Sequence, residues 1–286
     1  MRVIRNLEEL RAASQALGRP LGLGGVLVPT MGALHAGHAA LITRGAELVR
    51  ASGRRGAGCI VSIFVNPTQF TEHADFDRYP RTLEADTALC EAAGADCIFA
   101  PDVGAMYPTP DAAPVPPLPS VASDPGLEDR FRPGHFAGVC QVVMRLFKLL
   151  VPDAAVFGEK DWQQLQVVTA MVRSAGLLTR IDPHQTLRDP DGLALSSRNR
   201  FLSPEERAAA LAIPRALRAA QAHPDVAQAE AAMRRELESS GLLVEYAAAR
   251  DARTLGTFVP GRSGRVLIAA RAGGTRLIDN REWAGR

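Results

Sequence analysis

Short apolar runs alternate with longer stretches of helical period through the first two thirds of the chain. After a short strand and a charged helix at the start, apolar runs at residues 26–28, 59–65, 97–100 and 154–157 predict buried strands. Helices are expected at residues 38–50 and 82–93, and apolar positions share one helical face across residues 139–150. Strands separated by helices predict an α/β fold with a doubly wound parallel sheet.

The pattern changes after Asn199. Ser203, Pro204 and Glu206 form the capping-box signature of a helix start. Alanine-rich helical segments follow to about residue 240, and strands are expected at 243–248, 265–270 and 275–278. The sequence therefore predicts a smaller α+β domain at residues 185–286 after a larger domain at residues 1–184.

A proline-rich segment at residues 101–119 interrupts the larger domain. Prolines oppose helix and central strand and favour extended, solvated backbone. We expect either a surface loop or a lid over the site.

Composition and charge limit the class of protein. Lys and Arg (33) against Asp and Glu (31) leave a net charge of +2, and aromatic residues make up 5%, so no nucleic-acid partner is expected. The 47% hydrophobic fraction argues against disorder, and no apolar run approaches the roughly 18 residues of a membrane span. The N-terminal segment lacks the apolar core of a signal peptide, which predicts a cytoplasmic protein. Buried, reduced thiols are expected at Cys59, Cys90, Cys97 and Cys140, which show no CxxC spacing.

The first candidate site lies between the strand at residues 26–28 and the next helix. Its glycines let the backbone approach a ligand, and His35 and His38 stand three residues apart. Such imidazoles can neutralise charge that develops on a triphosphate under attack. The alternatives are a metal pair, which lacks an HExxH or carboxylate-rich frame, and a structural turn with incidental histidines. The HxGH tetrad itself is a moderately specific sign of class I adenylyl-transfer enzymes.

A second candidate group lies at the end of the strand at residues 59–65. Pro67 stops this strand and presents Asn66 and Gln69 from the loop. Neutral amides donate and accept without adding charge, which suits a ligand with hydroxyl and carboxylate groups. An ordinary Asn-Pro turn would explain the same residues.

A third group follows the strand at residues 154–157. Gly158 permits close approach of a ligand, Lys160 offers an ammonium to phosphate, and Asp161 can accept ribose hydroxyls. Gln164 lies one helical turn beyond Lys160 and can point the same way. The alternative is a Lys-Asp surface pair that caps the helix.

A fourth group, Ser196, Ser197 and Arg198, follows the predicted domain boundary. Two hydroxyls and a guanidinium make a compact phosphate clamp, although this tripeptide alone also suits a plain loop. The first three groups all follow the carboxyl ends of predicted parallel strands, where open α/β sheets bind ligands. We therefore expect these groups to form one site.

Long motifs occur in order along nearly the whole chain: PTMGALHAGH, SIFVNPTQF, DFDRYPRTLEAD, RPGHFAGV, FGEKDWQQL, DGLALSSRNRFLS and RLIDN. On these motifs the chain resembles the pantothenate synthetase (pantoate–β-alanine ligase) family. The resemblance implies a Rossmann-like fold of class I nucleotidylyltransferase type, a homodimer and two reaction steps in one site. ATP, with Mg²⁺, adenylates the carboxylate of (R)-pantoate and releases diphosphate. The amine of β-alanine then attacks the pantoyl adenylate and releases AMP.

The resemblance also implies roles for individual residues. The catalytic positions are His38, His35, Lys160 and Arg198, and the substrate-binding positions are Gln69, Gln164, Asn66 and Arg132. Asp86 matches an acidic position near the Mg²⁺-triphosphate. The ATP-binding positions are Met31, Gly32, Ala33, Leu34, His35, Ala36, Gly37, His38, Gly158, Glu159, Lys160, Asp161, Leu187, Leu195, Ser196, Ser197 and Arg198.

The chain departs from the family pattern at three places. Ala36 stands where glutamate is usual and Ala39 where leucine is common. Asp129 stands where glycine commonly precedes the RPGHF motif. This departure leaves the conformation of the local loop undetermined, and with it the detailed role of Arg132.

Two other functions compete with the ligase. An adenylyltransferase for a nucleotide or phosphopantetheine substrate predicts a smaller chain and does not explain the paired glutamines Gln69 and Gln164. A catalytically silent nucleotide-binding protein would be favoured by loss of His38, Lys160 or Arg198, but all three are present.

Overall fold

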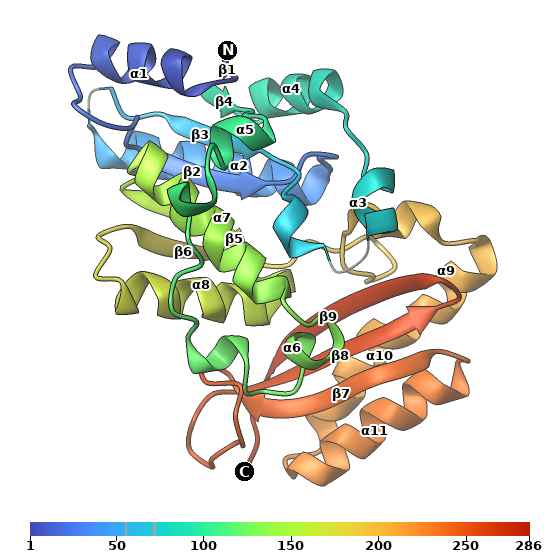
Figure 1. The fold of residues 1–286 in the computed structure, drawn as a ribbon. Helices are drawn as coiled ribbons and strands as arrows, with labels where there is room; N and C mark the ends of the chain where they lie inside the picture. The colour runs from blue at the N-terminus through green and yellow to red at the C-terminus, as the bar shows by residue number, and fades with distance from the viewer. Residues whose placement is uncertain (55, 71–72) are drawn as a thin grey trace.

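A computed structural model describes residues 1–54, 56–70 and 73–286 of the chain. A six-stranded parallel sheet, ordered β1-β4-β3-β2-β5-β6, forms its first part (Figure 1). Its strands are β1 (Arg2–Ile4), β2 (Val26–Thr30), β3 (Cys59–Ile63), β4 (Cys97–Phe99), β5 (Ala154–Gly158) and β6 (Arg180–His184). The predicted doubly wound parallel sheet is therefore confirmed.

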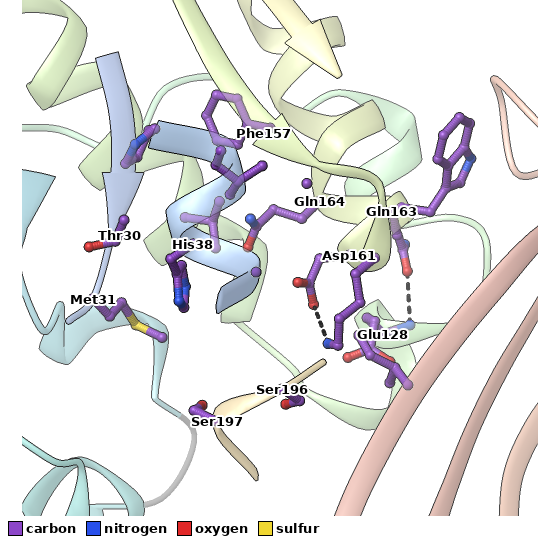
Figure 2. A pocket seen from close by; sticks show the side chains of 18 of the residues that line it. Thr30, Met31, His38, Glu128, Phe157, Asp161, Gln163, Gln164, Ser196 and Ser197 are labelled. Atoms are coloured by element: carbon purple, nitrogen blue, oxygen red, sulfur yellow. Dashed lines mark hydrogen bonds and ion pairs between the residues drawn. The ribbon is translucent and has the colours of Figure 1, made fainter. Parts of the chain in front are cut away.

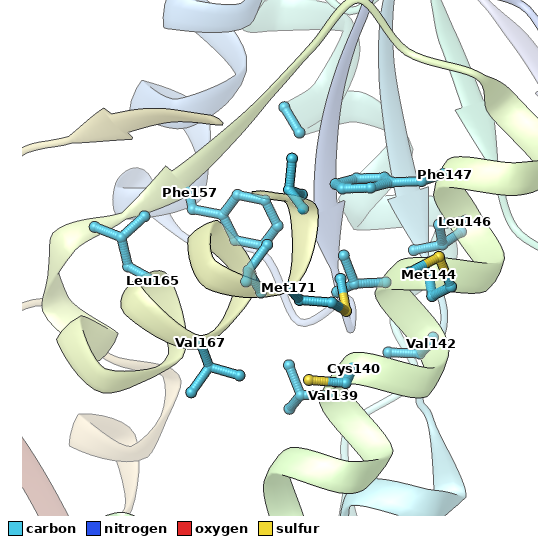
Figure 3. Close-up of a cluster of buried hydrophobic side chains, with 14 of the residues drawn as sticks. Val139, Cys140, Val142, Met144, Leu146, Phe147, Phe157, Leu165, Val167 and Met171 are labelled. Carbon is cyan, nitrogen blue, oxygen red and sulfur yellow. The ribbon is translucent and has the colours of Figure 1, made fainter. Parts of the chain in front are cut away.

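Helices cover both faces of this sheet. One face packs against α1 (Leu7–Ala16), α7 (His135–Leu150) and α8 (Trp162–Ser174), and the other packs against α2 (Ala36–Ser52) and α4 (Leu83–Ala92). Nearly every turn of α7 contributes buried apolar side chains, and Figure 3 shows several of them facing Phe157 of β5 and Met171 of α8. Burial on both sides makes α7 the central helix of this core.

The C-terminal part is built on an antiparallel sheet. Its strands, in the order β7-β8-β9, are β7 (Leu243–Asp251), β8 (Gly264–Ala272) and β9 (Thr275–Trp283). Three helices precede it in the chain: α9 (Pro204–Ala210), with the predicted Ser203–Glu206 capping box, α10 (Ala212–Ala219) and α11 (Val226–Ser239). Alternate residues of β8 enter two different cores, with Ile268 beside α10 and Leu267 in the core of the parallel sheet. Because β8 is buried on both faces, it packs the C-terminal sheet against the core of the parallel sheet.

Three local expectations need correction. The strand at residues 59–65 ends at Ile63, because the chain turns into a short 3-10 helix, η1 (Pro67–Gln69). The proline-rich segment contains a one-turn helix, α5 (Val103–Met106), which is capped by Asp102. The helix can form because none of its own residues is a proline. The edge strand β6 was not predicted, because its charged residues and Pro183 hide the strand pattern.

The remaining helices are short: α3 (His73–Arg78) and α6 (Glu128–Phe131). In the described ranges, the model contains no helix with the length and apolar character needed to cross a membrane. All four cysteines are free thiols, and three of them are buried while Cys97 is half-buried.

Candidate active site

One pocket lies at the carboxyl ends of β2 and β5, the two strands on either side of the point where the sheet order reverses. Open α/β sheets bind ligands at this switch point. Figure 2 shows His38, Gln164, Asp161 and Ser196 surrounding the same space. The predicted residues that line it are Met31, His35, Gly37, His38, Asn66, Gln69, Arg132, Gly158, Lys160, Asp161, Gln164, Leu187, Leu195, Ser196, Ser197 and Arg198.

His35 and His38 form the start of helix α2. Nδ1 of His35 accepts a hydrogen bond from the backbone N–H of Gly37 (3.1 Å), and Nδ1 of His38 accepts one from the N–H of His35 (3.3 Å). Because both Nδ1 atoms accept, the neutral rings carry their protons on Nε2. Burial lowers the pKa of both histidines, that of His38 to about 3, and the neighbouring imidazole adds to the effect at His38. The pocket thus presents two neutral ring N–H donors, with ring centroids 4.2 Å apart.

The loop before α2 is shaped by Asp86. Its buried carboxylate accepts hydrogen bonds from the N–H groups of Ala33 (3.1 Å) and Leu34 (2.8 Å) and from the Thr82 hydroxyl (3.2 Å). Gly32 lies in the left-handed region (φ 82°), so the chain can turn sharply there. The predicted contacts Gly32, Ala33, Leu34 and Ala36 do not line the pocket.

Asp86 does not fit the predicted Mg²⁺ site. Both of its oxygens already accept hydrogen bonds, and it is not among the pocket-lining residues. Among the residues the model describes, there is no cluster of three or more His, Cys, Asp or Glu side chains that could hold a metal ion. The geometry therefore gives Asp86 the role of holding the Gly32–Leu34 backbone.

Asn66 is predicted to bind substrate, but its side-chain amide forms hydrogen bonds within the protein. Its Nδ2 donates to Gln69 Oε1 (3.2 Å) and to the Gly138 carbonyl (3.1 Å), while its Oδ1 accepts from Thr68 and Tyr107. A Cβ at Gly138 would collide with the Thr68 carbonyl, so only glycine lets α7 approach η1 this closely. Asn66 thus orients Gln69, whose Nε2 contacts the Met31 sulfur (2.7 Å).

The turn after β5, η4 (Glu159–Asp161), carries the cationic side of the pocket. The Lys160 ammonium lies 3.7 Å from the Asp161 carboxylate. Glu159 points away from the pocket and pairs with Arg265 (3.1 Å), so its side chain is not placed to touch a nucleotide. Gln164, in the first turn of α8, points into the pocket.

The opposite side is a hairpin that leads into a short 3-10 helix, η5 (Ser197–Phe201). Leu195 donates its N–H to the Leu187 carbonyl (2.9 Å), and Arg188 pairs with Ala194 across the hairpin. Ser196 caps η5 by accepting from the Arg198 N–H (3.2 Å). The hairpin therefore fixes where Ser196, Ser197 and Arg198 meet the pocket.

Sequence reasoning missed a polar network at the pocket wall. Glu128 is buried, and Arg276 of β9 grips its carboxylate with two hydrogen bonds (2.6 and 2.8 Å) while Tyr246 donates a third (2.8 Å). Arg132 lies 3.6 Å from the same carboxylate and 3.1 Å from His135 Nε2. The RPGHF motif contains Arg132 and His135, but Arg276 and Tyr246 are more than a hundred residues away in the chain, where no local pattern reveals them.

Asp129, the departure from the family pattern, has a defined place in this wall. Its carboxylate accepts the N–H groups of Gly126 and Leu127 (2.9 Å each) and an amide proton of Gln163 (2.9 Å). Gln163 in turn accepts the Glu128 N–H (2.9 Å). These bonds order the segment before Arg132.

Comparisons with known proteins agree with this geometry. The family model described as "Pantoate-beta-alanine ligase" matches residues 2–282. A pantothenate synthetase of Nocardioides sp. is 48% identical over 96% of this chain and 82% of its own, and one of Thiobacillus denitrificans is 46% identical over 99% and 97%. The crystal structure of the Thermus thermophilus pantothenate synthetase superposes with a TM-score of 0.85 at 42% identity, over 98% of this chain and 99% of that one.

A second solved relative carries ligands. The Francisella tularensis pantoate-beta-alanine ligase, complexed with β-γ ATP and β-alanine, superposes with a TM-score of 0.79 at 30% identity, over 98% of this chain and 97% of that one. Both structures span nearly the whole chain, including its C-terminal sheet. The chain belongs to the pantoate–β-alanine ligase family of enzymes.

Proposed function

We propose that this enzyme condenses (R)-pantoate with β-alanine in two steps within the pocket at the switch point. The proposal rests on one observation: neutral ring donors, an ammonium, two guanidinium groups and several neutral amides surround a single cavity. Cations and ring donors suit a polyphosphate, and amides suit a small hydroxy acid. The Francisella relative, complexed with β-γ ATP and β-alanine, supports the nucleotide and the amine substrate of this proposal.

In the first step, a carboxylate oxygen of pantoate attacks the α-phosphorus of ATP. A P–O bond forms to pantoate, the bond to the β-phosphate oxygen breaks, and diphosphate leaves with the electron pair. Negative charge grows on the phosphate oxygens, where Nε2–H of His38 and His35, Lys160 and Arg198 act as donors. Since pantoate supplies the nucleophile, no side chain needs to attack.

Gln69 and Gln164 hold pantoate in this proposal. Asn66 fixes the amide of Gln69, and Gln164 reaches the same space from α8. Apolar side chains, among them Phe64, Val139 and Val143, line the neighbouring wall and suit the dimethyl carbon of pantoate. Arg132, held by Glu128, adds a cation to this wall.

In the second step, the amine of β-alanine attacks the acyl carbon of the adenylate. A C–N bond forms, the mixed anhydride C–O bond breaks, AMP leaves, and the amine loses a proton. The Leu195–Arg198 segment, on the nucleotide side of the pocket, would limit access of water to the anhydride. Leu187 and Asp161 complete the proposed nucleotide contacts.

Several coarser features belong to the same proposal. Residues 1–184 supply the nucleotide and pantoate sites, and residues 185–286 bring the phosphate-binding loop over them. The proposal also includes a homodimer and Mg²⁺ carried by ATP, which the family resemblance implies, and a cytoplasmic location.

The test is pantoate-dependent exchange of labelled diphosphate into ATP without β-alanine, followed by AMP release once β-alanine is added. We expect exchange only with pantoate present, and AMP formation only with all three substrates. Absence of pantoate-dependent exchange in folded enzyme would sink the two-step proposal.

A further inference from the structure

Two neighbouring residues of β9, Asp279 and Asn280, line the pocket but have no part in the steps above. They are 3% and 4% exposed, and β9 contacts both η4 and η5. Buried polar side chains are retained where their hydrogen bonds serve a purpose, because burying them without partners is costly.

Asn280 holds the turn that carries Lys160. Its Nδ2 donates to the carbonyl oxygens of Glu159 (2.9 Å) and Lys160 (2.8 Å), so both amide protons bind consecutive residues of η4. These carbonyls are 120 residues away in the chain, and the Lys160 ammonium extends from the same backbone into the pocket.

The orientation of this amide is determined by its third partner. Nε of Arg265 donates to Asn280 Oδ1 (2.7 Å), and a guanidinium has no acceptor. Oδ1 must therefore face Arg265, which leaves Nδ2 facing η4. Arg265 is itself fixed, because it lies 3.4 Å above the Trp162 ring and pairs with Glu159.

Asp279 holds the other side of the pocket. Its carboxylate forms two hydrogen bonds with Arg188 (2.6 and 2.9 Å) and also accepts the N–H of Asn280 (2.8 Å). Arg188 lies at the base of the hairpin that leads into Leu195–Arg198, and it donates across that hairpin to the Gly192 carbonyl (3.1 Å). A bidentate pair of this kind fixes direction as well as distance.

We propose that Asp279 and Asn280 are positioning residues that set the separation between the Lys160 turn and the Ser196–Arg198 loop. Because the two are adjacent in one strand, they hold both cationic walls at a fixed spacing. Lys160 and Arg198 then reach the same polyphosphate together. This inference rests on the proposed function, since it needs a ligand that spans both walls.

The first test is a double-mutant cycle between Asn280 and Lys160. Asn280→Asp keeps the shape and the bond to Arg265 but replaces both donors with an oxygen that faces two carbonyls. We expect the rate of adenylate formation to fall roughly 10- to 100-fold, as for a catalytic group displaced by about 1 Å, while the KM for pantoate changes by less than about threefold. In the Lys160→Ala background the same change should cost less than about threefold, because its effect passes through Lys160.

The second cycle combines Asp279→Asn with Arg198→Ala in the same way.

Asn6→Asp is the matched control for Asn280→Asp, because Asn6 caps α1 at the surface, where aspartate caps as well. If Asn280→Asp does not fold, Asn280→Ala removes both donors without adding charge and enters the same cycle. Thermal unfolding and titration of active sites by adenylate formation normalise each rate to folded enzyme.

The outcomes separate this inference from the proposed function. Non-additive losses in both cycles support it. Where the wild-type enzyme shows pantoate-dependent exchange, two results overturn the part of the inference that a cycle tests. One is that the losses of the two substitutions are additive, and the other is that a smaller folded fraction explains them. If the wild-type enzyme shows no such exchange, the proposed function fails and this inference fails with it.

Discussion

Replacing His38 with alanine removes one donor from the proposed adenylation site while leaving its neighbour in place. The ring of His38 uses Nδ1 to accept the backbone N–H of His35, so Nε2–H is its single donor toward the pocket. With a pKa of about 3, the ring is neutral at neutral pH and contributes a hydrogen bond rather than a positive charge. The substitution therefore tests a hydrogen bond and leaves the charge of the pocket unchanged.

Three magnitudes follow from this geometry. Loss of one donor aimed at developing charge typically costs about 10²–10³ in kcat, so we expect a fall in exchange rate of at least about 100-fold. The KM for ATP should change by less than about threefold, because the donor acts mainly in the transition state. Leaving the His35 N–H without its partner should cost about 1 kcal/mol of unfolding free energy, or roughly 2–4 °C in Tm for a chain of this size.

The assay is pantoate-dependent exchange of diphosphate into ATP, measured at pH 7 with thermal unfolding of the same samples. His223→Ala is the control, because His223 does not line the pocket. An exchange rate within threefold of wild type in the His38→Ala enzyme would refute the assignment. A fall that matches the loss of folded protein would show that the imidazole serves the helix start and not the reaction.

Three further predictions concern the walls of the pocket. Gln164→Ala should raise the KM for pantoate about tenfold, by loss of one polar contact, with little change in the KM for ATP; equal values for wild type and variant would remove Gln164 from the pantoate site. Asp86→Asn should lower the unfolding free energy by about 1–3 kcal/mol without altering the Mg²⁺ dependence of exchange, and a large increase in the Mg²⁺ requirement would make Asp86 a ligand after all. Burial raises the pKa of Glu128, but hydrogen bonds and charge from Arg276 lower it more, so the pKa lies below its ordinary 4.5. Its stabilising effect is therefore present above about pH 4.5 and lost as the pH falls further, and the urea midpoint of Glu128→Gln should depend less on pH between about 5 and 3 than that of wild type.

Most strands of the parallel sheet could be predicted because they are short, continuous apolar runs. Residues 59–63 and 154–158 are examples in which the side chains are buried on both faces. Strand β6 could not, since it lies at the sheet edge, where Arg180, Asp182 and Pro183 are tolerated. Local composition describes the environment of a strand, and the charged residues and proline of β6 make this edge strand resemble a loop.

The motifs predicted which segments meet but not which side chains turn inward. Glu159 and Lys160 are adjacent, yet Lys160 faces the pocket while Glu159 faces Arg265, because a 3-10 turn rotates successive side chains by about a third of a turn. Asn66 shows the same limit, since its amide is used by Gly138 and Tyr107 from distant segments. Such partners depend on tertiary packing, which spacing along the sequence does not reveal.

The neutral imidazoles at the start of α2 have a consequence for turnover. A site built from fixed cations would bind diphosphate about as tightly as it binds the triphosphate, and the leaving group would then leave slowly. Neutral ring N–H donors stabilise charge through hydrogen bonds, and they carry no charge of their own to retain the product. His35 and His38 can thus favour bond breaking without adding to the attraction that the fixed cations Lys160 and Arg198 exert on diphosphate.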